Sequence, residues 1–267
     1  MDHKFQWTPQ KIAARLKLIG GLVYRRRHPL PPFRYRALSG PEAPPPVAPD
    51  VDDGAWEVIE PFSYWGAWST DFVLRSTFEV PSDWSAGEIA LHLPLGEAGD
   101  IFCHPEALAH IDGVPFASAD RYHHEVLLPM EARDGRTHAL ALHGWTGLSG
   151  WPPDPTSRTR LFMKECAVVE IDTPTRDFLV RAEMALELAG AMEEDATARG
   201  RILSALDAAC GRLDTREPLR TESFYASVPE AAEILDAGLA EAGPPMDVDL
   251  VGVGHAHMDI AYLWQVT

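Results

Sequence analysis

Cysteine is scarce in this sequence, and long apolar runs are absent from it. The three cysteines, Cys103, Cys166 and Cys210, are far apart and odd in number, which argues against a disulfide framework or a cysteine-based metal site. No run approaches the roughly 18 apolar residues that a membrane span needs. The start, Met-Asp-His-Lys-Phe-Gln, lacks the apolar stretch of a secretory signal. We therefore expect a soluble protein of the reducing cytoplasm, with no membrane partner.

Basic residues are scarce outside the N-terminal segment. The formal net charge is -17, but residues 1–36 hold nine Lys or Arg against one acid, so the rest of the chain carries about -25. A basic tail can bind nucleic acid, yet this one has no recognisable binding fold, and the acidic body would repel phosphate. We therefore expect no nucleic-acid partner.

Helical spacing within the basic segment suggests a different role. Thr8 followed by Pro9 is a typical helix start. Apolar residues then recur on one helical face at Ile12, Leu16, Ile19 and Val23. The pattern predicts an amphipathic arm that packs on the acidic body or on a second subunit. Residues 29–49 contain eight prolines and little that could be buried, so we expect an extended linker or strap. Together these residues define an arm and linker over 1–49.

Short alternating segments with Gly and Pro between them fill the next region, residues 50–172. The expected strands are Phe72–Val80, Ile89–Leu95, Leu108–Asp112, Val126–Leu128, His138–His143 and Leu161–Ile171. Asp112-Gly113 between two such runs is a tight hairpin signal. Repeated short strands of this kind predict a β-sandwich of the jelly-roll type.

A helical period replaces the alternation after Thr173-Pro174. Apolar residues at helical spacing predict three helices over 173–245, with a capping box at Ser227–Glu230 and a stop at Gly243. Alanine-rich faces suit close helix packing and suggest no chemistry, so we interpret this region as a scaffold.

Tryptophans and histidines in the sandwich region each allow two interpretations. Aromatic platforms can bind sugar rings, but large aromatic residues more often pack in a core or interface. The tryptophans concerned are Trp56, Trp65, Trp68, Trp84, Trp145 and Trp151. The histidines show no metal-ligand spacing, which favours surface or hydrogen-bonded roles. They are His104, His110, His123, His124, His138 and His143.

The last segment carries the strongest indication of chemistry. The apolar run at 247–254 predicts a buried strand, and His255, His257 and Asp259 follow it directly. Residues two apart on an extended chain share a face, so these three side chains can point into one pocket. Imidazole and carboxylate groups suit Zn²⁺ or a similar divalent ion, which needs about three or four protein ligands. Delivery of such groups from the end of a strand is typical of an α/β barrel.

The sequence H-A-H-M-D-I-A-Y-L-W at 255–264 resembles the opening motif of the catalytic domain of glycoside hydrolase family 38, the zinc-dependent α-mannosidases of the cytosolic or vacuolar and bacterial type. Further similarity runs through most of residues 50–267, including Leu93–Asp100, Ile111–Pro115 and Asp120–Leu128. The resemblance implies zinc-ligand roles for His257 and Asp259, with His255 shaping the pocket. It implies that Tyr262, where the family usually has Trp, stacks on the bound sugar. Gln265 replaces the usual Pro.

These features predict a mainly β fold with helices: a jelly-roll-like β-sandwich at 50–172, a helical connector at 173–245, and the first strand of a truncated β/α barrel at 246–267. The resemblance implies the N-terminal portion of a retaining α-mannosidase that acts on a mannose-containing oligosaccharide. It places both catalytic carboxylates downstream, so residues 1–267 alone should be inactive. Exposed apolar surface near 247–267 should favour a homo-oligomer.

Two alternatives remain. The first is a metal-dependent hydrolase of the amidohydrolase type, in which His255 and His257 are the ligands and the substrate is an amide or ester. The second is a carbohydrate-binding or assembly module without catalysis of its own.

Overall fold

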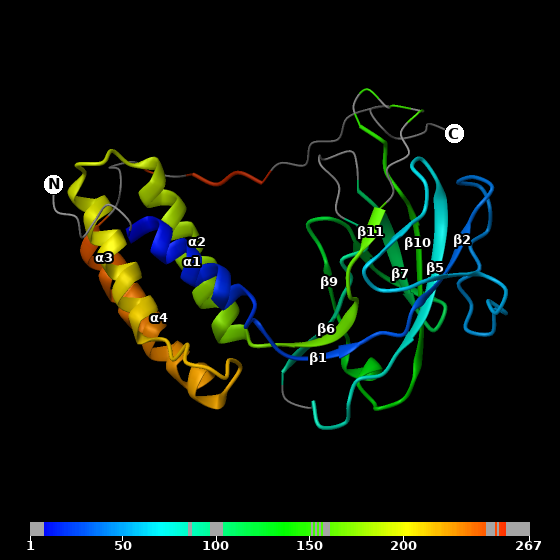
Figure 1. The fold of residues 1–267 in the computed structure, drawn as a ribbon, viewed down its shortest axis with the longest axis horizontal. Coiled ribbons are helices and arrows are strands. Elements are labelled where there is room, and N and C mark those ends of the chain that lie inside the picture. Colours follow the sequence, from blue (N-terminus) through cyan, green and yellow to red (C-terminus); the bar gives the residue numbers. More distant parts are fainter. Residues whose placement is uncertain are drawn as a thin grey trace.

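Sheets and helices form two separate units in the computed structural model. It describes residues 8–84, 87–96, 104–150, 152, 154, 156, 161–243, 249 and 251–254. Figure 1 shows a β-sandwich on one side, a group of helices on the other, and a narrow junction between them. The expected mainly β fold with helices is confirmed, and the sheets do not close into a barrel.

The sandwich is built from antiparallel strands. A four-stranded sheet has the order β1-β12-β6-β9, a six-stranded sheet has the order β3-β2-β5-β10-β7-β8, and β11 pairs with β4. The strands are β1 Tyr24–Pro29, β2 Phe33–Ala37, β3 Glu57–Ile59, β4 Ser63–Trp65, β5 Asp71–Phe78, β6 Glu88–His92, β7 Glu106–Ile111, β8 Val114–Ala119, β9 Glu125–Leu127, β10 His138–Trp145, β11 Leu161–Met163 and β12 Ala167–Ile171. A short 3₁₀ turn spans Met130–Ala132.

Alternation along the strands fills the space between the sheets. Phe72 and Leu74 of β5 and Leu142 of β10 are fully buried in one core, and Leu74 lies directly opposite Leu142 in the ladder. Trp65 is 0% exposed in the same core, and its indole Nε1 donates to the carbonyl of Leu95 at 2.6 Å. The predicted hairpin is confirmed, since Asp112 and Gly113 join β7 to β8 with φ of 50° and 81°.

The arm and linker boundary at residue 49 differs from the structure. Residues 24–29 form β1 and residues 33–37 form β2, so both belong to the sandwich. β1 pairs with β12 in the four-stranded sheet, and β2 pairs with β3 and β5 in the six-stranded sheet. β1 was not predicted because its run of arginines lacks the apolar alternation that indicates a strand. In the fold, acidic neighbours form ion pairs with these arginines.

The proline-rich strap predicted at 29–49 corresponds in the structure to residues 38–56, between β2 and β3. It lies over the six-stranded sheet and is fastened by Arg75 of β5, which is only 5% exposed. The guanidinium Nε contacts the Asp53 carboxylate at 2.8 Å, and its two terminal nitrogens donate to the carbonyls of Pro46 and Pro49 at 3.2 and 3.4 Å. Because proline has no N–H group, a proline-rich segment presents mainly carbonyl acceptors. These acceptors suit the donors of a buried arginine.

The helical unit contains the predicted connector and the N-terminal arm. Its helices are α1 Thr8–Gly20, α2 Thr173–Ala191, α3 Thr197–Arg212 and α4 Glu222–Ala242. Ile12, Leu16 and Ile19 of α1 are buried in the core of this unit. Lys11 and Arg15 both pair with Asp207 of α3, at 3.3 and 3.2 Å. The arm therefore packs on the acidic body of its own chain.

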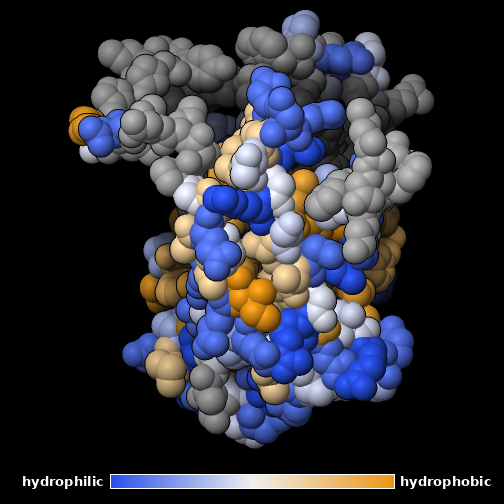
Figure 2. Space-filling view, turned by 90° about the vertical axis from the view of Figure 1, so that its left-hand side faces the viewer, coloured by the Kyte–Doolittle hydropathy of each residue, from blue (hydrophilic) through white to orange (hydrophobic). Residues whose placement is uncertain are grey.

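Figure 2 views the helical end of the molecule, where hydrophilic residues predominate around a small apolar patch. Exposed apolar side chains on the helices include Leu18, Val180, Met184 and Leu188. None of the helices in the described residues is long and apolar enough to cross a bilayer.

The start predicted for the last helix is wrong. α4 begins at Glu222, where the Thr221 side chain accepts from the amide of Phe224, and Ser227–Glu230 lies inside the helix. Pro229 is tolerated there although it cannot donate to the carbonyl of Tyr225 one turn earlier. The predicted stop is confirmed at Gly243, whose φ of 72° suits glycine.

The buried strand predicted at 247–254 is absent from the described part of that segment. Residues 249 and 251–254 have no regular secondary structure, and Val251 and Val253 are 85% and 81% exposed. A strand needs a hydrogen-bonded neighbour, and none of the described strands offers one to this segment.

Candidate functional site

The residues with the strongest sequence signal, His255, His257, Asp259 and Tyr262, lie outside the described residues. Within the part of the chain that the structure describes, no group of three or more His, Cys, Asp or Glu side chains could hold a metal ion. The geometry of the predicted zinc site therefore stays a prediction.

In the part of the chain that the structure describes, two cysteines are buried, and His138 is held by carboxylates. Cys166 and Cys210 are buried free thiols, and burial raises the pKa of Cys166 to about 12 and that of Cys210 to about 11. Thiols of this kind are unreactive. His138 lies between Asp112 and Asp134, with ring nitrogen to carboxylate distances of 2.7 and 3.1 Å. The predicted hydrogen-bonded role is confirmed for His138.

Three of the described tryptophans of the sandwich, Trp56, Trp65 and Trp84, contact other protein groups. Trp65 and Trp84 are core residues at 0% and 6% exposure, and the Arg36 guanidinium lies 5.6 Å from the ring centre of Trp56. The aromatic side chains that do face solvent include Phe62, Tyr64 and Tyr122, which no sequence pattern singled out.

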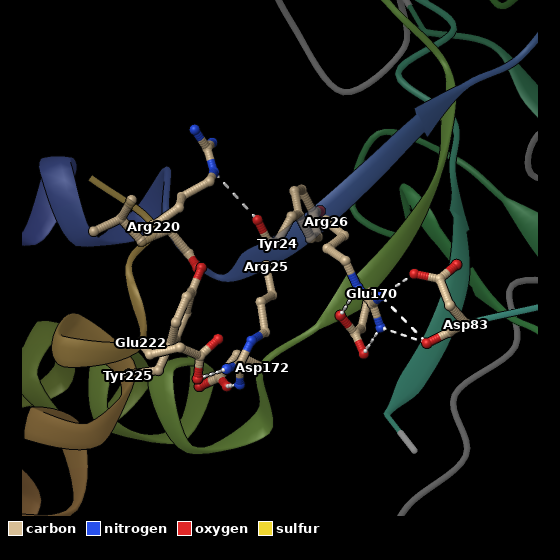
Figure 3. A network of polar contacts seen from close by, with 10 residues as sticks. Tyr24, Arg25, Arg26, Asp83, Glu170, Asp172, Arg220, Glu222 and Tyr225 are labelled. Carbon is tan, nitrogen blue, oxygen red and sulfur yellow. Dashed lines mark hydrogen bonds and ion pairs between the residues drawn. The ribbon is translucent and has the colours of Figure 1, made fainter. Parts of the chain in front are cut away.

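A network of polar contacts lies at the junction of the two units (Figure 3). The Arg25 guanidinium contacts the Asp172 carboxylate at 3.5 Å and forms a short ion pair with Glu222. It also lies 4.4 Å from the ring centre of Tyr225. The hydrogen bond to Glu222 raises the pKa of Arg25. Arg25 therefore links β1 to the first turns of α2 and α4.

Arg26 faces the sandwich side of the same junction. Its guanidinium forms a two-pronged contact with Glu170 of β12 at 2.6 and 2.9 Å, and a third contact with the Asp83 carboxylate at 2.8 Å. It lies 5.1 Å from the ring centre of Trp84. Two-pronged arginine–carboxylate contacts are among the stronger ion pairs and fix geometry as well as charge.

A cavity of about 460 Å³ opens beside these residues. Arg25, Arg133, Glu170 and Asp172 line it. Arg133 donates to the backbone carbonyls of Leu128 and Gly87, and the other three groups take part in the ion pairs above. Because these charges already engage protein partners, the cavity has the character of a structural contact rather than of a reaction site.

A second polar cluster is formed by side chains of β1, β6 and β9 of the four-stranded sheet and by Arg176 of α2. The Tyr24 hydroxyl donates to Glu125 at 2.6 Å, and Arg176 contacts the other oxygen of that carboxylate at 2.6 Å. Burial raises the pKa of Tyr24 above its usual value. The His92 ring centre lies 5.0 Å from that of Tyr24. Burial, with Arg27 and His124 nearby, lowers the pKa of His92 to about 4.

We predict that His92 makes the protein less stable in mild acid. Its folded-state pKa of about 4 lies below the usual 6.5, so the unfolded chain binds the proton more readily. The contribution of neutral His92 to the free energy of unfolding is thus fully present above pH 6.5 and is lost as the pH falls toward 4. Allowing for the half-buried position, the loss is about 2 kcal/mol.

Urea unfolding between these pH values measures the loss. His92→Gln should flatten the pH dependence, and His28→Gln, at an exposed position, should leave it unchanged. Equal slopes in all three proteins would refute the assignment.

Comparisons with known proteins give a distant structural likeness and no sequence relative. No protein-family model matches the chain, and no curated protein matches it. A β-glucuronidase from Ruminococcus gnavus in complex with uronic isofagomine is 13% identical with a TM-score of 0.39. The match covers 55% of this chain and 29% of that one. A second structure of Ruminococcus gnavus β-glucuronidase is 12% identical with a TM-score of 0.34, covering 55% and 28%.

The chain thus spans under a third of the length of these neighbours. They are glycosidases, but at this identity and TM-score the likeness supports no statement about the activity of the present chain.

The junction residues were missed at the sequence level, although part of the signal was visible. The run Arg25-Arg26-Arg27 stood out as a charge asymmetry. Its partners Glu170 and Glu222 lie more than 140 residues away along the chain, and only the fold brings them together.

Proposed function

We propose that this chain is the N-terminal part of a zinc-dependent retaining α-mannosidase. The single observation that carries the proposal is the motif H-A-H-M-D-I-A-Y-L-W at 255–264, with its resemblance to glycoside hydrolase family 38. The substrate class that follows is a terminal α-mannoside of a mannose-containing oligosaccharide.

The donor set of the motif fits zinc. An imidazole and a carboxylate two residues apart, His257 and Asp259, are ligand types that Zn²⁺ prefers, and they can share one face of an extended segment. No alternative metal group exists in the described residues, so the motif is the place to which we assign the metal. When bound, zinc supplies a Lewis acid that holds sugar hydroxyls.

The remaining residues have binding and scaffold roles in this proposal. Tyr262 presents an aromatic face to the apolar side of the sugar ring and so orients the sugar. The sandwich and the helices, which lack a metal group in their described residues, support the catalytic part of the protein. Both catalytic carboxylates belong to other segments of the enzyme, as the family resemblance implies.

Metal-dependent turnover tests the proposal. The full-length protein is assayed with p-nitrophenyl α-mannoside before chelation, after chelation and after zinc is restored, with p-nitrophenyl β-glucuronide and p-nitrophenyl acetate in parallel. We expect hydrolysis of the α-mannoside alone, a fall of at least about a hundredfold on chelation, and recovery with zinc. Turnover of the ester without the α-mannoside would refute the proposal in favour of the amidohydrolase-type alternative.

A further inference from the structure

The sandwich and the helical unit have separate hydrophobic cores with only a thin apolar contact between them. The contact cluster consists of Val23, Ala90, Ala167, Val169 and Ile171, with Tyr24 and Leu179 packed against it. Leu179 of α2 is the only one of these residues that a helix contributes. Units that share so little apolar surface can move relative to each other unless other contacts hold them.

The chain crosses between the units at two adjacent points. Residues 21–23 join α1 to β1, and Asp172 joins β12 to α2. β1 and β12 are antiparallel neighbours, and Tyr24 lies opposite Ile171, so the two crossings lie side by side. Figure 1 shows them as the narrow junction of the molecule. Two adjacent short crossings can act as a hinge, because a few residues then absorb the change in direction.

A third segment holds the first crossing from the side. Arg220, just before α4, donates to the carbonyls of Gly21 and Tyr24 at 2.7 and 3.4 Å, and the Tyr225 hydroxyl donates to the carbonyl of Leu22 at 3.2 Å. Arg220 has φ of 61°, a left-handed conformation that is unfavourable for a residue with a side chain. The surrounding contacts compensate for this strain, which is a recurrent feature of functional positions.

Ion pairs complete the arrangement. Arg176 of α2 contacts the Glu125 carboxylate of β9 at 2.6 Å, and Arg25 forms two further pairs. Arg25 lies on β1, whereas Glu222 and Asp172 belong to the helical side, so both contacts cross the junction (Figure 3). The side chain of Glu222 is 86% exposed. Ion pairs that reach solvent are weak and are screened by salt, so this part of the junction should respond to ionic strength.

We propose that residues 21–24 and Asp172 form a hinge between the sandwich and the helices. The clasp, defined as Arg25, Arg176, Arg220, Glu222 and Tyr225, holds the hinge in the orientation seen here. Weakening the clasp lets the helical unit turn as a rigid body, while each unit keeps its own core. This inference does not depend on the proposed enzymatic activity.

The test compares the chain with its Arg25→Ala/Arg220→Ala variant. Hydrogen exchange by mass spectrometry follows the amides of residues 21–25 and 221–225, and small-angle X-ray scattering follows the distances between the units. Arg212→Ala is the matched control, because Arg212 pairs with Glu230 inside the helical unit.

We expect exchange at the hinge to rise roughly tenfold in the double variant, since several hydrogen bonds of modest strength are lost together. The distance distribution should broaden, with protection of the two cores unchanged. Unchanged exchange and scattering in a folded double variant would overturn the proposal. Should that variant fail to fold, the wild-type chain at about 0.05 and 1 M NaCl decides, since a hinge held by ion pairs must loosen in high salt. A distribution independent of salt would then overturn it.

Discussion

Replacement of Asp259 by alanine in the full-length protein is expected to remove bound zinc and to abolish hydrolysis of α-mannosides. Loss of a partner outside the metal's own ligands already costs about 10- to 100-fold in metal affinity or activity, so loss of a ligand should exceed roughly a hundredfold. Zinc is measured by mass spectrometry of the desalted protein, and turnover with p-nitrophenyl α-mannoside.

His255 separates the two hydrolase hypotheses. In the proposed mannosidase, His257 and Asp259 are ligands, so His255→Ala should keep zinc. In an amidohydrolase-type site, His255 and His257 are the ligands, so the same variant should lose zinc. Asp249→Ala is the control, because Asp249 is an exposed carboxylate ten residues upstream of Asp259. Zinc retained in Asp259→Ala and lost in His255→Ala would contradict the assignment made here.

Much of the sandwich could be predicted because its strands report their environment directly. Alternate apolar residues of β5 and β10, such as Phe72, Leu74, Leu140 and Leu142, lie in the core of the sandwich, and Asp112-Gly113 supplies the conformations of a tight turn. α2 begins where predicted, because the Asp172 side chain accepts from the amide of Thr175 and Pro174 follows in the first turn. Local chemistry is sufficient for these elements.

The elements that were not predicted correctly depend on long-range pairing or on competing local signals. β1 consists of Tyr-Arg-Arg-Arg-His-Pro, which has no apolar alternation, and becomes a strand through its ladder with β12 and its ion pairs. The start of α4 at Glu222, capped by Thr221, was hidden by the stronger local signal of Ser227 and Pro229. The segment 247–254 was predicted as a strand from apolar content alone, but strand formation depends on a neighbour that residue content does not reveal.

The candidate site divides in the same way. The proposed zinc motif is a local pattern that a sequence can display in full, and its geometry stays a prediction, whereas the junction depends on tertiary structure. Arg25 contacts Glu222 across almost two hundred residues of chain, and no periodicity links the two. Residues that position one unit against another are thus harder to predict than residues that bind a metal through a short motif.

Trp65→Ala is expected to cause the largest loss of stability in the sandwich. The indole is fully buried between the sheets, where its ring contacts Tyr35 and Phe72 with centre distances of 5.7 and 5.0 Å. Truncation of a buried tryptophan costs about 3–5 kcal/mol, because the cavity left behind does not close fully. The carbonyl of Leu95 also loses its indole donor, which adds about 1–3 kcal/mol if no water replaces it.

Two matched variants separate these contributions to the loss at Trp65. Trp65→Phe keeps most of the volume and removes the donor, so it should cost less than Trp65→Ala while still leaving the Leu95 carbonyl unpaired. Trp56→Ala removes a tryptophan that is not in the core and should lower the midpoint little. Thermal unfolding followed by circular dichroism should show a fall of roughly 10 °C or more for Trp65→Ala. Equal midpoints for Trp65→Ala and Trp56→Ala would contradict the view that burial of Trp65 stabilises the sandwich.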